Sequence, residues 1–292
     1  MALVSDSTRA SRDTLRMAIN MRVIDLTRPL DETSLLWPGI SPIVVESTET
    51  IERDGSFSRR VSLDEHSGTH FDAPSHFSEG AAHVADVPAS QLVRPLHVVD
   101  FTVQASVDPD AELTPRDLKE HESAHGSIDA GSVVFLHTDW PAISGSQPLR
   151  FPGFGVEAAS LLVARGVVGL GTDTLGIDPG HATGFPVHRD VTLPRGIWHV
   201  ENLTNLGAVP GSGAWAVVGV PRVAGASGFP ARVLAVVLLP ESHFGEHGDQ
   251  DSMSAIGILS PGSTADSKST GEDPVSEDRK STSVDNDVSA LG

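Results

Sequence analysis

The sequence contains no cysteine among its 292 residues. Disulfide bonds and thiolate chemistry are therefore excluded, and any metal site must use histidine, aspartate, glutamate or water as ligands. No apolar run is long enough to cross a bilayer, and the first residues lack the apolar centre of a secretory signal. We therefore expect a cytoplasmic protein with no membrane partner.

Positive charge is also scarce. The chain has 20 lysine and arginine residues against 39 aspartate and glutamate residues, which gives a formal net charge of −19. A nucleic-acid partner requires a basic surface, so this composition argues against one. Part of the acidity lies in residues 245–292, whose richness in serine, glycine and aspartate predicts a disordered tail. Residues 1–20 are expected to be a peripheral extension, so that residues 21–244 form a single domain.

Apolar runs and alternating patterns predict strands at residues 23–26, 43–45, 59–72, 96–101, 131–136, 167–171, 197–200, 215–220 and 233–239. Thr114 and Pro115 have the residue types of an N-cap and a first helical position, so a helix should begin there. Residues 156–164 predict a second helix that Gly166 ends. This alternation of helix and strand predicts an α/β fold. Trp198 and Trp215 are expected in the core.

The most informative segment places His66, Gly68, His70 and Asp72 at positions of one parity. If the segment is a strand, these residues share one side, because successive side chains alternate between faces. Two imidazoles and a carboxylate suit Zn or Mn, and Gly68 leaves room for an ion between them. The segment therefore predicts a metal-binding face.

His76 completes the spacing but lies beyond Pro74, which interrupts the strand and lets His76 turn separately. A helix would also bring His66 and His70 together, as in metalloproteases. Thr69, Pro74 and the glycine between the histidines oppose a helix. The remaining alternative is a surface loop that happens to be rich in histidine.

Two downstream residues also have the character of metal ligands. His188 follows a proline, and Glu201 lies in a strand of otherwise apolar residues. An acid in such a strand is costly to bury unless it is paired or bound to a metal. The alternatives are that His188 is a surface residue and that Glu201 pairs with Arg189 or Arg195.

Residues 66–77 resemble the signature of the cyclase family of metal-dependent hydrolases, which includes bacterial kynurenine formamidases and isatin hydrolases. Residues 171–178, 201–206 and 228–232 match further family motifs in the expected order. The resemblance extends over residues 23–239. It implies a swivelling β/β/α domain, with a mixed sheet or barrel-like core and flanking helices, that assembles as a homodimer or tetramer.

The resemblance also implies roles for individual residues. The positions that match the metal ligands of the family are His66, His70, Asp72, His188 and Glu201. Formamidases hold two ions, whereas relatives with one ion use Mn, so we expect one or two divalent ions, Zn or Mn. Asp72 or Glu201 could bridge two ions. His76 matches the histidine of proton transfer, and Glu201 is the second candidate catalytic residue.

Two residues are candidates for substrate binding. Trp37 lies where relatives often place an aromatic side chain beside the site, and a flat substrate could stack on it. Ser227 precedes the last family motif, where related enzymes use a serine in proton transfer. The sequence departs from the usual Thr-Gly-Trp of the family, because Asp139 stands between Thr138 and Trp140. The sequence alone does not predict the geometry of a loop with an acid at this position.

These expectations predict a hydrolase that cleaves the C–N bond of an amide or cyclic amide with metal-activated water. The partner is a small, aromatic substrate. A lactone hydrolase or a biosynthetic cyclase would use the same metal face. A metal-binding protein without activity would keep the ligands but would not need His76.

Overall fold

The structure is a computed structural model that describes residues 20–141 and 149–239. The predictions of an N-terminal extension and a disordered C-terminal tail concern residues that lie outside this described part. Within it, no helix combines the length and the apolar character needed to span a membrane.

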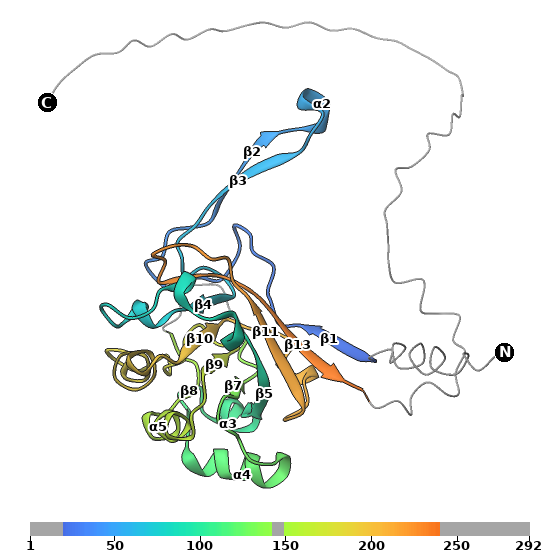
Figure 1. Cartoon of the computed structure of the whole chain (residues 1–292). Coiled ribbons are helices and arrows are strands. Elements are labelled where there is room, and N and C mark those ends of the chain that lie inside the picture. The colour runs from blue at the N-terminus through green and yellow to red at the C-terminus, as the bar shows by residue number, and fades with distance from the viewer. Residues whose placement is uncertain (1–19, 142–148, 240–292) are drawn as a thin grey trace, which may run out of the picture. The chain divides into compact units, whose positions relative to one another are not determined.

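A large, curled mixed sheet of nine strands forms the centre of the fold (Figure 1). Its strands, in spatial order, are β1 (Met21–Asp25), β13 (Arg232–Leu238), β11 (Ala214–Gly219), β5 (Val93–Asp100), β7 (Val133–His137), β9 (Gly169–Thr172), β10 (Trp198–Glu201), β4 (His70–Asp72) and β12 (Gly228–Pro230). Strands β5, β7, β9 and β10 run parallel, and the outer pairs are antiparallel. The sheet confirms the predicted α/β class.

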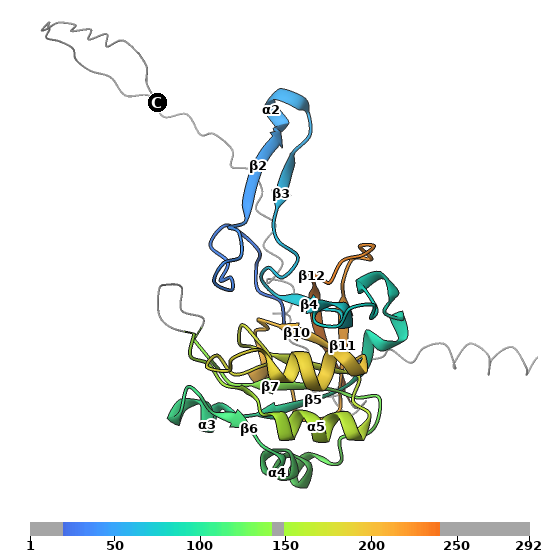
Figure 2. The same ribbon diagram turned by 90° about the vertical axis from the view of Figure 1, so that its left-hand side faces the viewer.

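The principal helices are α3 (Thr102–Val107), α4 (Pro115–His125) and α5 (Val156–Arg165). Thr114 caps α4 as predicted, because its side chain accepts from the backbone N–H of Asp117, whose carboxylate returns to the Thr114 N–H. Helix α5 ends at Gly166, which has the left-handed φ of 80° that the prediction required. Both helices pack on one face of the sheet (Figure 2).

Short helical turns connect the larger elements. The 3-10 helices are η1 (Pro74–His76), η2 (Val84–Asp86), η3 (Ala89–Gln91), η5 (Leu193–Arg195) and η6 (Leu206–Ala208), and η4 (Val187–Thr192) is a π-helix. Strands β6 (Glu112–Leu113) and β8 (Gly153–Phe154) form a small parallel sheet. Strands β2 (Val44–Glu49) and β3 (Ser58–Ser62) form an antiparallel hairpin with helix α2 (Ile51–Asp54) at its turn, and the hairpin extends away from the nine-stranded sheet (Figures 1 and 2).

The sheet has an apolar core on each face, because alternate residues of its strands point to opposite sides. Val98 belongs to one core, whereas Val99 belongs to the helix-covered core. Trp198 is buried, as predicted. The prediction for Trp215 was wrong: this side chain is 42% exposed, because it lies on the outward side of β11 while Ala214 faces the core.

The prediction of one strand over residues 59–72 was also wrong. The chain forms β3 and β4 there, with a loop between them. Gly68 interrupts the strand, because its φ of +64° lies in the left-handed region. A Cβ at this position would lie 2.5 Å from Cδ1 of Leu30. His66 therefore reaches the site from a loop, and the alternation that predicted a shared strand face applies only to His70 and Asp72.

Candidate metal centre

Strands β4 and β10 bring four ligand-type side chains to one face of the sheet. In their antiparallel register, His70 lies opposite Glu201 and Asp72 lies opposite His199. Directly opposed residues of neighbouring strands project to the same side. All four side chains are buried. The pairing of two short strands therefore builds half of the site.

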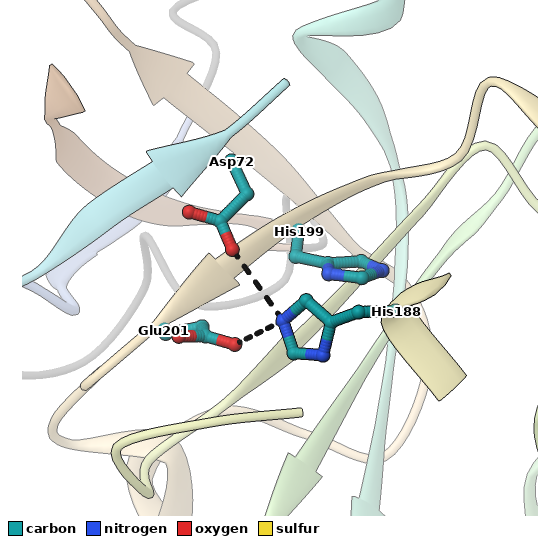
Figure 3. A group of neighbouring side chains, drawn as sticks. All are labelled: Asp72, His188, His199 and Glu201. Atoms are coloured by element: carbon teal, nitrogen blue, oxygen red, sulfur yellow. Dashed lines mark hydrogen bonds and ion pairs between the residues drawn. The ribbon is translucent and has the colours of Figure 1, made fainter. Parts of the chain in front are cut away.

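His188 reaches this group from η4. Figure 3 shows its ring directed between Asp72 and Glu201: Nε2 lies 3.0 Å from Oε1 of Glu201 and 3.6 Å from Oδ2 of Asp72. The Asp178 carboxylate accepts from the backbone N–H groups of Val187 and His188 and lies 2.5 Å from Nδ1 of His188. Such a carboxylate behind a histidine fixes the ring and leaves the other nitrogen free for a metal.

His66 is held in the same way from its loop. Its Nδ1 lies 2.7 Å from Oδ1 of Asp72, and its Nε2 lies 3.0 Å from Oγ of Ser227. The Ser227 hydroxyl donates to Oε2 of Glu65 at 2.8 Å, so its oxygen accepts from Nε2–H of His66. A Cβ on Gly228 would lie 2.3 Å from Cε1 of His66, so the ring requires glycine beside it.

His70 follows the same pattern. Its Nδ1–H donates to the backbone oxygen of Gly68 at 2.9 Å. Its Nε2 faces Oδ1 of Asp72 at 3.2 Å and Oε2 of Glu201 at 3.5 Å. The three histidines that the resemblance predicted as ligands therefore each present one nitrogen to the carboxylates.

The two carboxylates divide the site into two adjacent groups of donors. Asp72 directs Oδ1 toward His66 and His70 and Oδ2 toward His188. Glu201 directs Oε2 toward His70 and Oε1 toward His188. Oε1 also accepts the backbone N–H of Ile177 at 2.8 Å, which fixes the carboxylate. Each carboxylate thus has one oxygen for each group.

His199 is a site residue that the sequence reasoning missed. Its Nε2 lies 2.8 Å from Oγ1 of Thr192, and the Thr192 hydroxyl donates to the backbone oxygen of Val187. His199 must therefore donate Nε2–H, which leaves a lone pair on Nδ1. This buried Nδ1 has no hydrogen-bond partner among the described residues. The available signal was its position two residues before Glu201, which puts both on one face of β10.

The donor set fits a divalent transition metal. Ligand atoms from Asp72, His188, His199 and Glu201 all lie within 4.8 Å of one another. Imidazole nitrogens and carboxylate oxygens are the ligands that Zn and Mn accept when thiolates are absent. The unpartnered Nδ1 of His199 adds a buried lone pair that an ion would satisfy.

Charge in the site is balanced by protons on the histidines. Although burial opposes it, the neighbouring carboxylate of Asp72 raises the pKa of His70 to about 9. Burial also opposes the charged form of His188, yet hydrogen bonds to Asp178, Asp72 and Glu201 raise its pKa well above the usual value. A metal ion that binds such ligands must displace their protons, so binding should release protons.

His76 lies beside this cluster, with a ring nitrogen within 4.8 Å of ligand atoms of His66 and Asp72, but among the described residues no hydrogen bond or ion pair joins its side chain to them. Helix η1 begins at Pro74 and turns the side chain separately, as predicted. Its ring stacks on that of His66 with centroids 3.8 Å apart. Burial lowers the pKa of His76 to about 4, so the ring is neutral near pH 7 and able to accept a proton.

The cluster opens into a cavity of about 380 Å³ whose other walls are mostly apolar, with Asp64 as a further charged residue of the lining. The hydrophobic lining residues are Leu35, Leu36, Trp37, Ile40, Phe77, Leu175 and Phe185. The Phe185 ring packs against Trp37 and Phe77 at centroid distances of 5.6 and 5.4 Å. Its backbone has the positive φ of 54° that bulky residues rarely adopt. Ser227 is not one of the described residues that line this cavity, so its contact with substrate stays a prediction.

The loop in which Asp139 stands in place of the family's usual glycine keeps a backbone conformation that suits glycine. Asp139 has a φ of +54°, which aspartate tolerates better than most residues. Its N–H and that of Thr138 donate to the Asp173 carboxylate. The side chain of Trp140 is anchored by a bond from Nε1 to the oxygen of Arg150. These bonds fix the loop without a glycine.

Comparison with known proteins points to one family. The sequence profile described as "Putative cyclase" matches residues 24–179. The chain is 33% identical over 194 residues to an isatin hydrolase from Roseibium aggregatum, covering 60% of this chain and 73% of that one. It is 27% identical over 181 residues to a kynurenine formamidase from Bacillus cereus, covering 62% and 81%. A crystal structure of an isatin hydrolase bound to the product analogue thioisatinate superposes with a TM-score of 0.71 at 26% identity, covering 81% and 100%.

Proposed function

The chain belongs to the cyclase family, and from this premise we propose that it is a metal-dependent hydrolase that cleaves the C–N bond of an aromatic amide or cyclic amide. Its relatives are hydrolases. One observation carries the proposal: the buried cluster of histidines and carboxylates forms the polar end of a cavity whose other walls are mostly apolar. A cavity of about 380 Å³ is at the small end for ligand sites, which favours a compact substrate.

We assign the metal ligands in two groups that share both carboxylates. His66 and His70 would hold one ion with Asp72 and Glu201, and His188 and His199 would hold a second with the same carboxylates. Hydrolysis by protein of known metal content, with Zn or Mn supplied, would distinguish Zn from Mn and one ion from two. When bound, a divalent ion lowers the pKa of a water ligand and polarises a substrate carbonyl.

The chain itself supplies binding, orientation and proton transfer. The rings of Trp37, Phe77 and Phe185 would stack on an aromatic substrate and direct its carbonyl toward the carboxylate end of the cavity. His76, neutral near pH 7, would accept a proton from the attacking water. The water oxygen adds to the carbonyl carbon, the C–N bond breaks, and His76 returns the proton to the departing nitrogen. The products are an amine and a carboxylic acid, which releases the second proton of the water to the solvent near pH 7.

A hydrolysis panel tests this proposal on protein of known metal content. The substrates are N-formylkynurenine, isatin, cyclic imides and lactones, each with Zn or Mn supplied. We expect turnover of an aromatic amide or cyclic amide that disappears with a chelator and returns with metal. The His181→Ala variant is the matched control, because this exposed histidine lies outside the cavity.

The other outcomes distinguish the remaining candidates. Turnover of lactones alone would favour a lactone hydrolase. Metal binding without turnover of any substrate would favour a metal-binding protein without hydrolase activity. Homo-oligomeric assembly and a cytoplasmic location stay predictions, which native mass measurement and cell fractionation would test.

A further inference from the structure

A second group of histidines lies outside the cavity described above. His97 projects from β5, and His121 and His125 lie one turn apart on α4. Nδ1 of His97 and Nε2 of His121 are 3.2 Å apart, and both side chains are buried. Together with Glu122 between them, the two helical histidines spell His-Glu-x-x-His, a pattern that presents two imidazoles on one helix face.

The spacing of the His97 and His121 rings suits a shared ion, and the His125 ring would join them after a rotation. Two nitrogens that bind one tetrahedral zinc at 2.0–2.1 Å lie about 3.3 Å apart, close to the His97–His121 separation. Ring centroids around such an ion are about 5 Å apart. The observed centroid distances are 5.5 Å for His97 and His121 and 4.9 Å for His121 and His125. His125 is exposed, so its ring can rotate to complete the set.

The protonation states also favour binding. Burial lowers the pKa of His97, and burial together with His97 and His125 lowers the pKa of His121 to about 4. Both imidazoles are therefore neutral near pH 7, the form in which histidine binds a metal.

Glu122 shows that this group differs from a metallopeptidase. In peptidases with this pattern the glutamate acts as general base. Here its Oε1 lies 2.7 Å from Nη1 of Arg165 and accepts the backbone N–H of Ile128 at 3.0 Å. The carboxylate is thus committed to joining α4 to α5 and to the following loop, and the site has a binding role without peptidase chemistry.

We propose that His97, His121 and His125 bind one divalent transition-metal ion of the zinc type, with water in the fourth position. The ion joins α4 to β5. Because it binds the folded chain in preference to the unfolded chain, it raises the thermal stability.

The test uses the full chain and zinc as the probe. Metal equivalents are counted by elemental analysis after equilibrium dialysis, and the melting temperature is measured with and without zinc. We expect His125→Ala to bind one equivalent fewer than the wild-type protein and to lose part of the zinc-dependent rise in melting temperature. His181→Ala should match the wild type, because it removes an exposed histidine elsewhere.

Two further variants keep the result interpretable. His97→Phe should lose the same equivalent as His125→Ala, and near-ultraviolet circular dichroism reports whether either variant is folded. His70→Ala should keep this equivalent, because its side chain belongs to the other cluster. Equal zinc content in wild-type protein and folded His125→Ala would overturn the proposal and leave His97 and His121 as a hydrogen-bonded pair only.

Discussion

The two histidine clusters lie on the same, helix-covered face of one sheet. A single row of cross-strand partners connects them: His97, Val134, Leu170, His199 and Asp72. Strands β5 and β10 are three strand spacings apart, roughly 14 Å. The cluster of the candidate metal centre interleaves its histidines with two carboxylates and opens into a cavity, whereas Glu122 of the second cluster pairs with Arg165.

Histidine side chains therefore meet opposite electrostatic environments in the two clusters. Carboxylates raise the pKa of His70 to about 9, while burial among other imidazoles lowers that of His121 to about 4. The comparison teaches that carboxylates and open space, more than the number of histidines, separate a candidate catalytic centre from a binding site.

The largest effect is expected from a substitution in the candidate metal centre. Asp72→Asn keeps the shape of the side chain but removes the charge that faces His66, His70 and His188. We expect loss of metal from this cluster and a fall of turnover to the background rate, measured by elemental analysis and substrate hydrolysis. Asp129→Asn is the control, because this carboxylate acts on His97 of the other cluster. Wild-type metal content in Asp72→Asn would contradict the assignment.

His76→Ala separates proton transfer from metal binding. Since His76 stacks on His66 and forms no hydrogen bond or ion pair with Asp72 or Glu201 among the described residues, we expect unchanged metal content and a fall in kcat of about 10²–10⁴-fold. His83→Ala serves as the control, because His83, unlike His76, does not line the cavity. A loss of metal together with activity would instead make His76 a ligand.

Asp178→Asn tests the support behind His188. The amide no longer carries the charge that orients the ring through Nδ1, so metal affinity should weaken by about 10–100-fold. Competition with a chelator measures this change, and the second cluster should keep its affinity. An unchanged affinity would show that the bonds from Asp178 to the backbone are its only role.

The smallest expected effect concerns the second cluster without metal. His97, His125 and Glu122 face His121, whose folded pKa of about 4 lies below its ordinary value of 6.5. As pH falls from 6.5 to 4, the unfolded chain takes up a proton that folded His121 resists, so stability decreases over this range. With a chelator present, the free energy of unfolding of His121→Phe should fall less between pH 7 and pH 5 than that of the wild type, as measured by urea unfolding. An equal fall in both proteins would contradict a lowered pKa of His121 in the folded chain.

Much of the fold could be predicted because its strands and helices have strong local patterns. The helices at Thr114 and before Gly166 begin and end where capping residues indicate. Local patterns could not show that the first strand pairs with the last, because that register depends on contacts distant in the sequence. They also failed at Gly68, where packing against Leu30 and a left-handed backbone interrupt the expected strand.

The candidate site could be predicted as far as the family motifs extended. The predicted ligands from His66 to Glu201 lie together in the structure, although His66 arrives from a loop. His199 was missed because the bond of Thr192 that fixes its tautomer comes from another segment. His97 was missed for a similar reason, since only the packing of α4 on β5 brings it to His121.

The π-helix η4 makes the site sensitive to the number of residues in this segment. It closes with a bond from the Leu193 N–H to the oxygen of His188, and it carries His188 and Thr192 on one widened turn. Such turns contain one residue more than an α-helix would need. Deleting a single residue here would rewind the turn and rotate His188 away from Asp178 with every ligand still present. Between His188 and Glu201, the number of residues constrains the site as strongly as their chemistry.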